Sequence, residues 1–202
     1  DVIAVIREGK TALHVDMKLH EPLTPSRAHR LASLVLPLGE RAVVGSRAHW
    51  NLRHLSALGV RVALDPSDEW NAWPPEVQVP GLSGRVNRHG LRDDSATGSD
   101  ASLAPEAYVR SRIDEISRLL PGAVEWMLDV STILRLEALC PGFAREIEAR
   151  GSALTAWGIR DEGPAKTMQT VHALCAAGAR FLIPQTDPRF VRYLAFEATP
   201  PV

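Results

Sequence analysis

The sequence predicts an α/β protein of the (β/α)₈-barrel, or TIM-barrel, class, incomplete and with about six β/α units present. Short apolar segments alternate with amphipathic ones along the chain, which is typical of βαβ units and a parallel sheet. The apolar segments are nearly continuous, as strands covered on both faces are. Polar residues recur where these segments end, and barrel enzymes build their sites there. No glycine-rich phosphate motif follows any strand, which disfavours a dinucleotide-binding fold.

Apolar periodicity predicts the elements of the first part of the chain in order. We expect helices at 1–8, 25–38 and 48–58, and strands at 12–18, 41–46 and 60–64. Gly39 and Gly59 follow the second and third helices directly, in the position where glycine commonly ends a helix. Asp65 and Pro66 then end the third strand.

The second part of the chain continues the same alternation after one interruption. Residues 67–102 are rich in Pro, Gly, Ser and Asp, and we interpret them as an irregular insertion over the open end of a single domain spanning 1–202. Beyond it we expect strands at 125–130, 154–159 and 181–183, and helices at 105–120, 131–150, 164–177 and 188–196. Pro141 and Gly142 should break the helix at 131–150.

Composition excludes several classes of partner. Lys and Arg total 23 against 24 for Asp and Glu, so nothing indicates binding to nucleic acid or to an anionic membrane. No run of about 18 apolar residues occurs, and we therefore expect no membrane span. No signal peptide is visible, which slightly favours the cytoplasm and leaves the compartment open. Cys140 and Cys175 lie in separate helical segments and match no metal or disulfide spacing.

Four strand ends carry motifs that can be compared with a known family. Asp16-Met17-Lys18 gives an acidic residue, any residue, then lysine, and Ser46 is followed by Arg47. The segment 154–161 carries Trp157, and 178–188 ends in Thr-Asp-Pro. In this order the motifs resemble the glycerophosphodiester phosphodiesterases, which are TIM barrels of the phosphatidylinositol phospholipase C-like superfamily. That family usually has Glu at the position of Asp16 and Phe at the position of Arg47.

The resemblance implies a phosphoric diester hydrolase of lipid and glycerol metabolism, which uses a metal to hydrolyse a small phosphodiester to an alcohol and glycerol 3-phosphate. It makes Asp16 a ligand of a divalent metal, Mg²⁺ or Ca²⁺, and it makes Lys18 the cation that neutralises the phosphate. Arg47 and Trp157 would also contact the substrate. His20 follows Lys18 closely in the sequence and is a further candidate contact.

The family's catalytic histidines have no counterpart in this chain. Its His-Arg-Gly and Glu-x-Asp motifs precede the strand that resembles 12–18, so we expect the acid–base histidines upstream of Asp1. No catalytic residue is therefore assigned, and the chain alone is expected to be inactive on glycerophosphodiesters.

Other interpretations stay open from the sequence. Asp16 and Lys18 fit equally well an ion pair that only holds the barrel mouth together. Trp157 fits core packing, and Arg47 fits a surface position after a strand. The whole protein could be a catalytically degenerate barrel that serves as a binding or structural module, or a related phospholipase-type phosphodiesterase.

Overall fold

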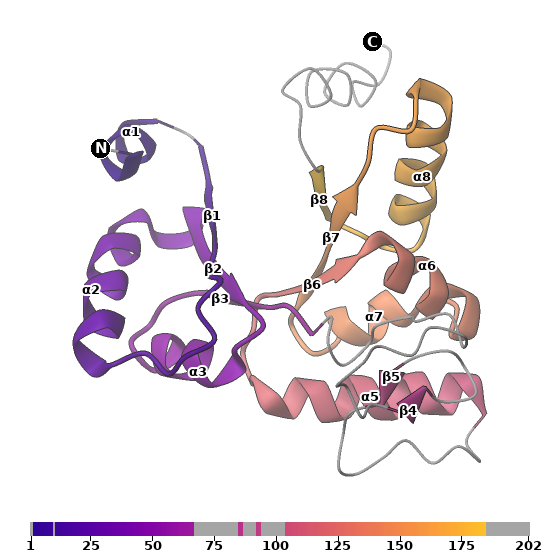
Figure 1. Ribbon diagram of the computed structural model, residues 1–202, viewed down its shortest axis with the longest axis horizontal. Helices are drawn as coiled ribbons and strands as arrows, with labels where there is room; N and C mark the ends of the chain where they lie inside the picture. Colours follow the sequence, from indigo (N-terminus) through magenta and orange to yellow (C-terminus); the bar gives the residue numbers. More distant parts are fainter. Residues whose placement is uncertain (1, 10, 67–84, 87–91, 94–103, 185–202) are drawn as a thin grey trace.

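The centre of the protein is one curled parallel sheet. The computed structural model describes residues 2–9, 11–66, 85–86, 92–93 and 104–184. Six strands lie in the order β1-β2-β3-β6-β7-β8, and each neighbouring pair is parallel (Figure 1). The predicted α/β class with a parallel sheet is thereby confirmed at this level.

The strands lie within the segments expected from the sequence or differ from them by a residue or two. They are β1 (Leu13–Asp16), β2 (Ala42–Ser46), β3 (Val62–Leu64), β6 (Glu125–Asp129), β7 (Ala153–Ile159) and β8 (Phe181–Pro184). Two further strands, β4 (Arg85–Val86) and β5 (Arg92–Asp93), form an antiparallel pair inside the predicted insertion. The first strand is shorter than expected, because β1 ends at Asp16 and Lys18 lies in the following loop.

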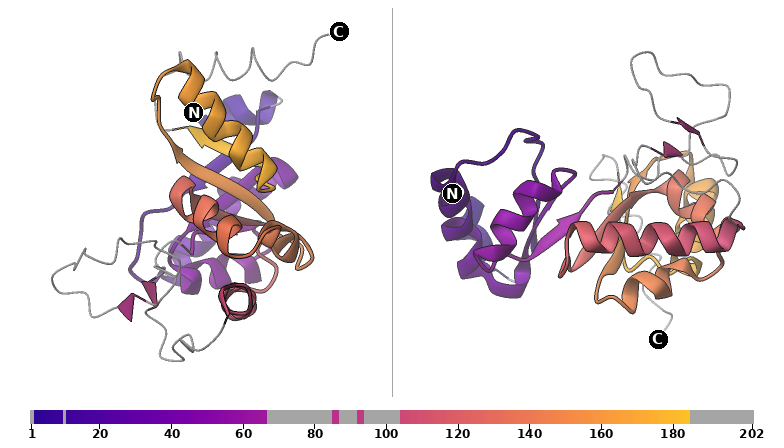
Figure 2. Two further views of the ribbon diagram at one scale, coloured as in Figure 1. Left: turned by 90° about the vertical axis from the view of Figure 1, so that its right-hand side faces the viewer. Right: turned by 90° about the horizontal axis from the view of Figure 1, so that it is seen from below.

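The helices cover the convex side of the sheet and leave the other side concave (Figures 1 and 2). They are α1 (Val2–Glu8), α2 (Pro25–Val35), a 3₁₀ helix η1 (Leu36–Arg41), α3 (His49–Ala57), α5 (Pro105–Leu119), α6 (Val130–Leu139), α7 (Phe143–Glu148) and α8 (Pro164–Ala176). The α1 helix contacts η1, and the Arg41 side chain donates a hydrogen bond to the Ile6 carbonyl at 2.7 Å. The others follow or precede the strands that they pack against, as in βαβ units.

Local sequence explains where several of these helices begin and end. Thr24 caps α2, because its Oγ1 accepts a hydrogen bond from the Arg27 amide at 3.4 Å, and a proline occupies the first turn. The break expected at Pro141 and Gly142 is also present, since α6 ends at Leu139 and α7 begins at Phe143. Gly142 has a φ of 78°, a left-handed conformation that glycine adopts at little cost, and the chain turns there from α6 into α7.

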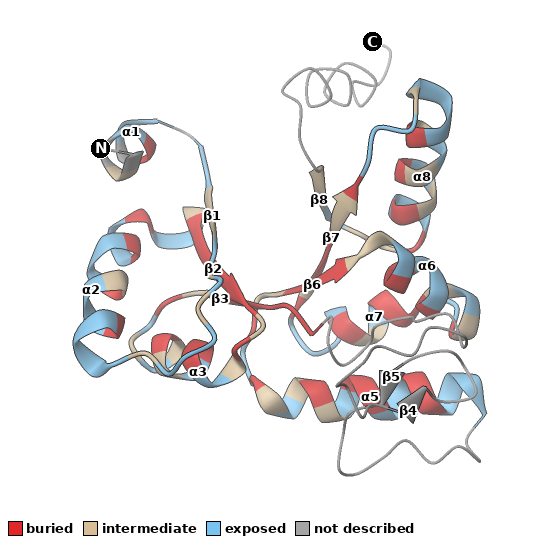
Figure 3. Cartoon of the chain, in the orientation of Figure 1, coloured by how far each residue is buried: buried red, intermediate tan, exposed pale blue. Residues whose placement is uncertain are grey.

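The main core lies between the convex face of the sheet and the helices (Figure 3). Alternate strand residues such as Val44 and Leu128 point toward it, because successive side chains of a strand face opposite sides. Helical residues such as Leu52 and Ile133 pack against them, and all four are fully buried. A second, smaller cluster lies on the other face and consists of Val43, Ala63 and Met127.

Two expectations fall outside the described residues and are not tested. These are the helix at 188–196 and most of the insertion at 67–102. The division of the chain into one domain with an insertion therefore stays a prediction.

Candidate functional site

The carboxyl-terminal ends of the parallel strands meet at one edge of the sheet, and polar residues gather there. Barrel and other parallel-sheet proteins bind ligands at this edge, because the loops that follow the strands can vary without disturbing the core. The polar residues at or just after the strand ends are Asp16 and Lys18 of β1, Ser46 and Arg47 of β2, Asp65 of β3, Asp129 of β6, and Arg160 of β7. This edge is the candidate functional site.

Asp16 and Lys18 lie together, as the sequence suggested. The Lys18 Nζ atom is 2.7 Å from Asp16 Oδ2, and the side chains are 77% and 49% exposed. An exposed pair of this kind contributes at most about 1 kcal/mol to folding, because water and salt screen the charges. The pair therefore costs little to open, and Lys18 can turn toward a ligand.

Arg47 is held by a carboxylate that the sequence-based assignment did not include. Its Nε lies 3.3 Å from Asp65 Oδ2, and Asp65 is buried at 9% exposure while Arg47 is 36% exposed. A buried carboxylate fixes the direction of a guanidinium because few other orientations keep it paired. The position of Asp65 directly after β3 was the signal that could have identified it.

His20 is exposed in the loop between β1 and α2. Its backbone carbonyl accepts a hydrogen bond from Trp50 Nε1 at 3.2 Å, and Trp50 lies in the first turn of α3. The Trp50 ring also meets the His49 ring edge to face, with 5.1 Å between ring centroids. Burial and the neighbouring Arg53 charge lower the pKa of His49.

Trp157 lies on the concave face and away from Lys18 along the sheet. It is on β7, and β2, β3 and β6 separate that strand from β1. It packs against the small cluster that includes Met127, and Ile183 on β8 faces it in the strand register. Its Nε1 atom is buried and makes no hydrogen bond within the described part of the chain. The structure thus places Trp157 in packing contacts, and a role in ligand contact stays a prediction.

A polar cluster on the concave face was missed from the sequence. His14 Nε2 lies 3.5 Å from Glu125 Oε2, and Thr155 donates a 2.8 Å hydrogen bond to the same oxygen. Burial raises the pKa of Glu125, but the contacts with His14 and Thr155 outweigh it and hold that pKa below its ordinary value. Gly45 makes room for this arrangement, since a Cβ there would lie 2.6 Å from Met127 Sδ and 3.0 Å from His14 Cε1.

Asp129 has a structural explanation. Its Oδ1 accepts hydrogen bonds from the Thr132 amide at 3.0 Å and from Ser131 Oγ at 2.5 Å, and its Oδ2 accepts one from Thr132 Oγ1. These bonds make it the N-cap of α6. The Ser131 hydroxyl is thus part of this cap.

The described residues do not fit a divalent-metal site. Carboxylate-rich clusters hold Mg²⁺ and Ca²⁺ in proteins. Within the described ranges, no three or more His, Cys, Asp or Glu residues come together in a way that could hold an ion. Asp16, the expected ligand, is paired with Lys18 instead. Its assignment to a metal stays a prediction.

Two surface hollows lie away from this edge. One of about 410 Å³ opens at the amino-terminal ends of β6, β7 and β8, and Glu148 and Arg180 in its lining pair with each other at 2.8 Å. The other, of about 420 Å³, lies outside the sheet where α6 and α7 meet the end of α8. Neither is lined by the exposed cations of the carboxyl-terminal edge.

Among the described residues, no helix has the length and apolar character needed to cross a bilayer.

Comparisons with known proteins return no family model and no curated protein that matches this chain. Among solved structures, a variant of the citrate synthase SbnG matches at 11% identity and a TM-score of 0.35, covering 98% of this chain and 85% of that one. An HpcH/HpaI aldolase/citrate lyase family protein from Burkholderia cenocepacia matches at 13% identity and a TM-score of 0.32, covering 98% and 96%. Likenesses this weak carry no argument about activity.

These findings overturn the resemblance to glycerophosphodiester phosphodiesterases. The solved structures that match are of other kinds, and no family model supports the phosphodiesterase assignment. The expected hydrolysis of phosphodiesters, the class of phosphoric diester hydrolase and the link to lipid and glycerol metabolism are therefore wrong. The physical reason is that the motifs were short strand-end patterns, and polar residues at strand ends are common to many parallel α/β proteins.

Proposed function

We propose that the carboxyl-terminal edge of the sheet binds a small anionic molecule, with Lys18 and Arg47 as its cationic contacts. The observation that carries the proposal is that these two cations follow adjacent strands and are each held by a carboxylate. In the strand register Asp16 lies opposite Gly45, so β1 and β2 end at nearly the same level. Neighbouring strands are about 4.8 Å apart, which lets two long cationic side chains reach one ligand.

The two cations have complementary properties. Arg47 is oriented by the buried carboxylate of Asp65 and offers a planar group suited to carboxylate or phosphate oxygens. Lys18 is largely exposed on a flexible stem and can adapt its position. Asp16 keeps Lys18 near the edge when no ligand is bound. His20 is a third exposed group on the same loop, and Trp157 on the concave face could contact the remainder of a larger ligand.

We also infer that the sheet is part of a (β/α)₈ barrel. The curl, the parallel register and the helices on the convex side support this arrangement (Figure 1). In the described residues β1 and β8 are the edge strands. Hydrogen exchange tests the inference: amides on the outer sides of β1 and β8 should be protected if further strands pair with them, and fast exchange there would show an open sheet.

The binding proposal is tested by titration calorimetry with phosphate and with malonate at low salt, using glycerol as a neutral comparison. We expect both anions to bind and glycerol not to bind. Lys18→Ala and Arg47→Ala should each weaken anion binding about tenfold to a hundredfold, the loss expected for one charge-assisted hydrogen bond. Higher salt should also weaken anion binding by the wild-type protein, because salt screens the charges.

Arg180→Ala is the matched control. Arg180 is an exposed arginine that pairs with the carboxylate of Glu148, but it lies at the opposite edge of the sheet. Its removal should leave the anion affinity unchanged. Equal affinities in the wild type, Lys18→Ala and Arg47→Ala proteins would contradict the proposal, as would the absence of anion binding by the wild type.

A further inference from the structure

We infer that Asn51 is a positioning residue, which fixes the loop at residues 17–24 so that Lys18 and His20 face the ligand. The inference rests on the proposed binding of an anion at this edge. Asn51 lies on α3, well away from that loop in the sequence, and it is only 2% exposed. A buried amide is stable only when its donors and its acceptor are satisfied, so its partners indicate what it holds in place.

Within the described part of the chain, the hydrogen bonds of the Asn51 side chain all go to the backbone of this one loop. Its Nδ2 donates to the carbonyls of Leu19 at 3.2 Å and Glu21 at 2.9 Å. Its Oδ1 accepts a hydrogen bond from the Leu23 amide at 2.8 Å. One side chain thereby satisfies three backbone groups that would otherwise require water or a regular element.

Neighbouring residues complete the attachment. The Met17 amide donates to the Gly45 carbonyl at 2.8 Å, and Ser46 Oγ donates to the Met17 carbonyl at 2.9 Å. Trp50 Nε1 donates to the His20 carbonyl at 3.2 Å. The loop is therefore held at almost every second residue by groups at the end of β2 and the start of α3.

This attachment decides which side chains of the loop face solvent. Met17 and Leu19 are partly buried, whereas Asp16, Lys18 and His20 are exposed. Exposed and partly buried side chains alternate from Asp16 to His20, which leaves the three polar groups open to solvent. If the loop loosened, Lys18 and His20 would sample many positions, and part of the binding free energy would be spent on ordering them.

Hydrogen exchange measures the attachment without any ligand. In Asn51→Ala the Leu23 amide loses its acceptor, and we expect exchange in 17–24 to become clearly faster while exchange in α5 stays the same. Ser152→Ala is the matched control, because Ser152 is also buried and its hydroxyl also donates to a loop carbonyl, that of Ala123, at the opposite edge of the sheet. The control should leave exchange in 17–24 unchanged.

Phosphate titration links the attachment to binding. Asn51→Ala should weaken phosphate binding about threefold to tenfold, the cost expected for ordering a loop and its side chains, and Ser152→Ala should not weaken it. Trp50→Phe removes the hydrogen bond to the His20 carbonyl but keeps an aromatic ring beside His49, and it is the variant to use if Asn51→Ala does not fold. It should raise exchange near His20 and weaken binding by about twofold.

The outcomes separate this inference from the proposed function. If hydrogen exchange in residues 17–24 is the same in Asn51→Ala and Trp50→Phe as in the wild type, the inference is wrong. Faster exchange with unchanged phosphate affinity shows that the loop is attached but does not position the binding groups, which also overturns the inference. If the wild type binds neither phosphate nor malonate, the proposed function fails, and the positioning role fails with it even though exchange still reports the attachment.

Discussion

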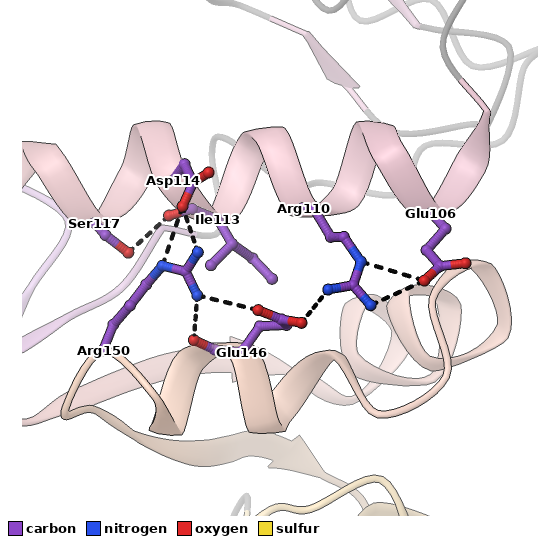
Figure 4. A network of polar contacts seen from close by, with 7 residues as sticks. All are labelled: Glu106, Arg110, Ile113, Asp114, Ser117, Glu146 and Arg150. Atoms are coloured by element: carbon purple, nitrogen blue, oxygen red, sulfur yellow. Dashed lines mark hydrogen bonds and ion pairs between the residues drawn. The ribbon is translucent and has the colours of Figure 1, made fainter.

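Charged side chains between α5 and α7 form one continuous network that joins two helices, whereas at the carboxyl-terminal edge Lys18 and Arg47 each pair with a carboxylate at the end of a strand. In the network Arg110 contacts Glu106 and Glu146, and Arg150 contacts Glu146 and Asp114 (Figure 4). Hydrogen bonding and the neighbouring carboxylate charges raise the pKa of both arginines. At the edge of the sheet Lys18 pairs with Asp16, and Arg47 pairs with Asp65.

The difference indicates two uses of charge. In the network each arginine lies between two carboxylates from two helices, so its charge is already balanced and a ligand would gain little. Lys18 pairs with Asp16 and is largely exposed, so an anion can approach it with a small loss of existing interactions. We interpret the network as a clamp between helices and the edge as a binding surface.

The largest expected effect on stability comes from the residue that joins the network. Glu146→Gln weakens contacts with both arginines, and we expect the melting temperature to fall by about 2 to 4 °C. Asp16→Asn breaks one exposed pair and should shift it by less than about 1 °C. Calorimetry at low salt measures both. High salt should shrink the difference because it screens exposed charges, and a larger effect for Asp16→Asn would reverse the comparison.

Glu125 is expected to have a smaller effect on the melting temperature than Glu146. Its carboxylate is neither in the helix network nor at the exposed edge, and it is partly buried beside polar partners. Its pKa in the folded protein is lowered, so its ionised form stabilises the folded state above the unfolded pKa of about 4.3. That stabilisation is lost as the pH falls through the folded pKa.

The test is thermal unfolding between pH 7 and pH 3. The wild type should lose about 1 to 2 °C more on acidification than Glu125→Gln, which has no proton to bind. Curves that run parallel for the two proteins would show that the contacts with His14 and Thr155 do not favour the ionised carboxylate.

Local patterns in the sequence were enough to predict much of the fold. The strands and helices follow from apolar periodicity over a few residues, and the break between α6 and α7 follows from Pro141 and Gly142. The end of β1 was placed two residues too late, because the pairing with β2 ends near Gly45 and not at a feature of the local sequence.

The candidate site was predictable only in part. Asp16 and Lys18 are neighbours in the sequence, so their contact could be expected. The pairing of Arg47 with Asp65, the role of Asn51 and the contact of His14 with Glu125 depend on which strands and loops become neighbours in space. The family assignment failed for the same reason, since isolated strand-end motifs do not determine the chemistry that the assembled edge performs.

The central claim is that the carboxyl-terminal edge, and not the network between α5 and α7, binds small anions. A titration of the ¹⁵N-labelled protein with phosphate, followed by amide NMR spectra at constant ionic strength, tests it most directly. We expect saturable shifts at residues 17–20 and 46–49 and no shifts around Glu146 and Arg150. Shifts confined to the network, or no saturable shift at the edge, would contradict the claim.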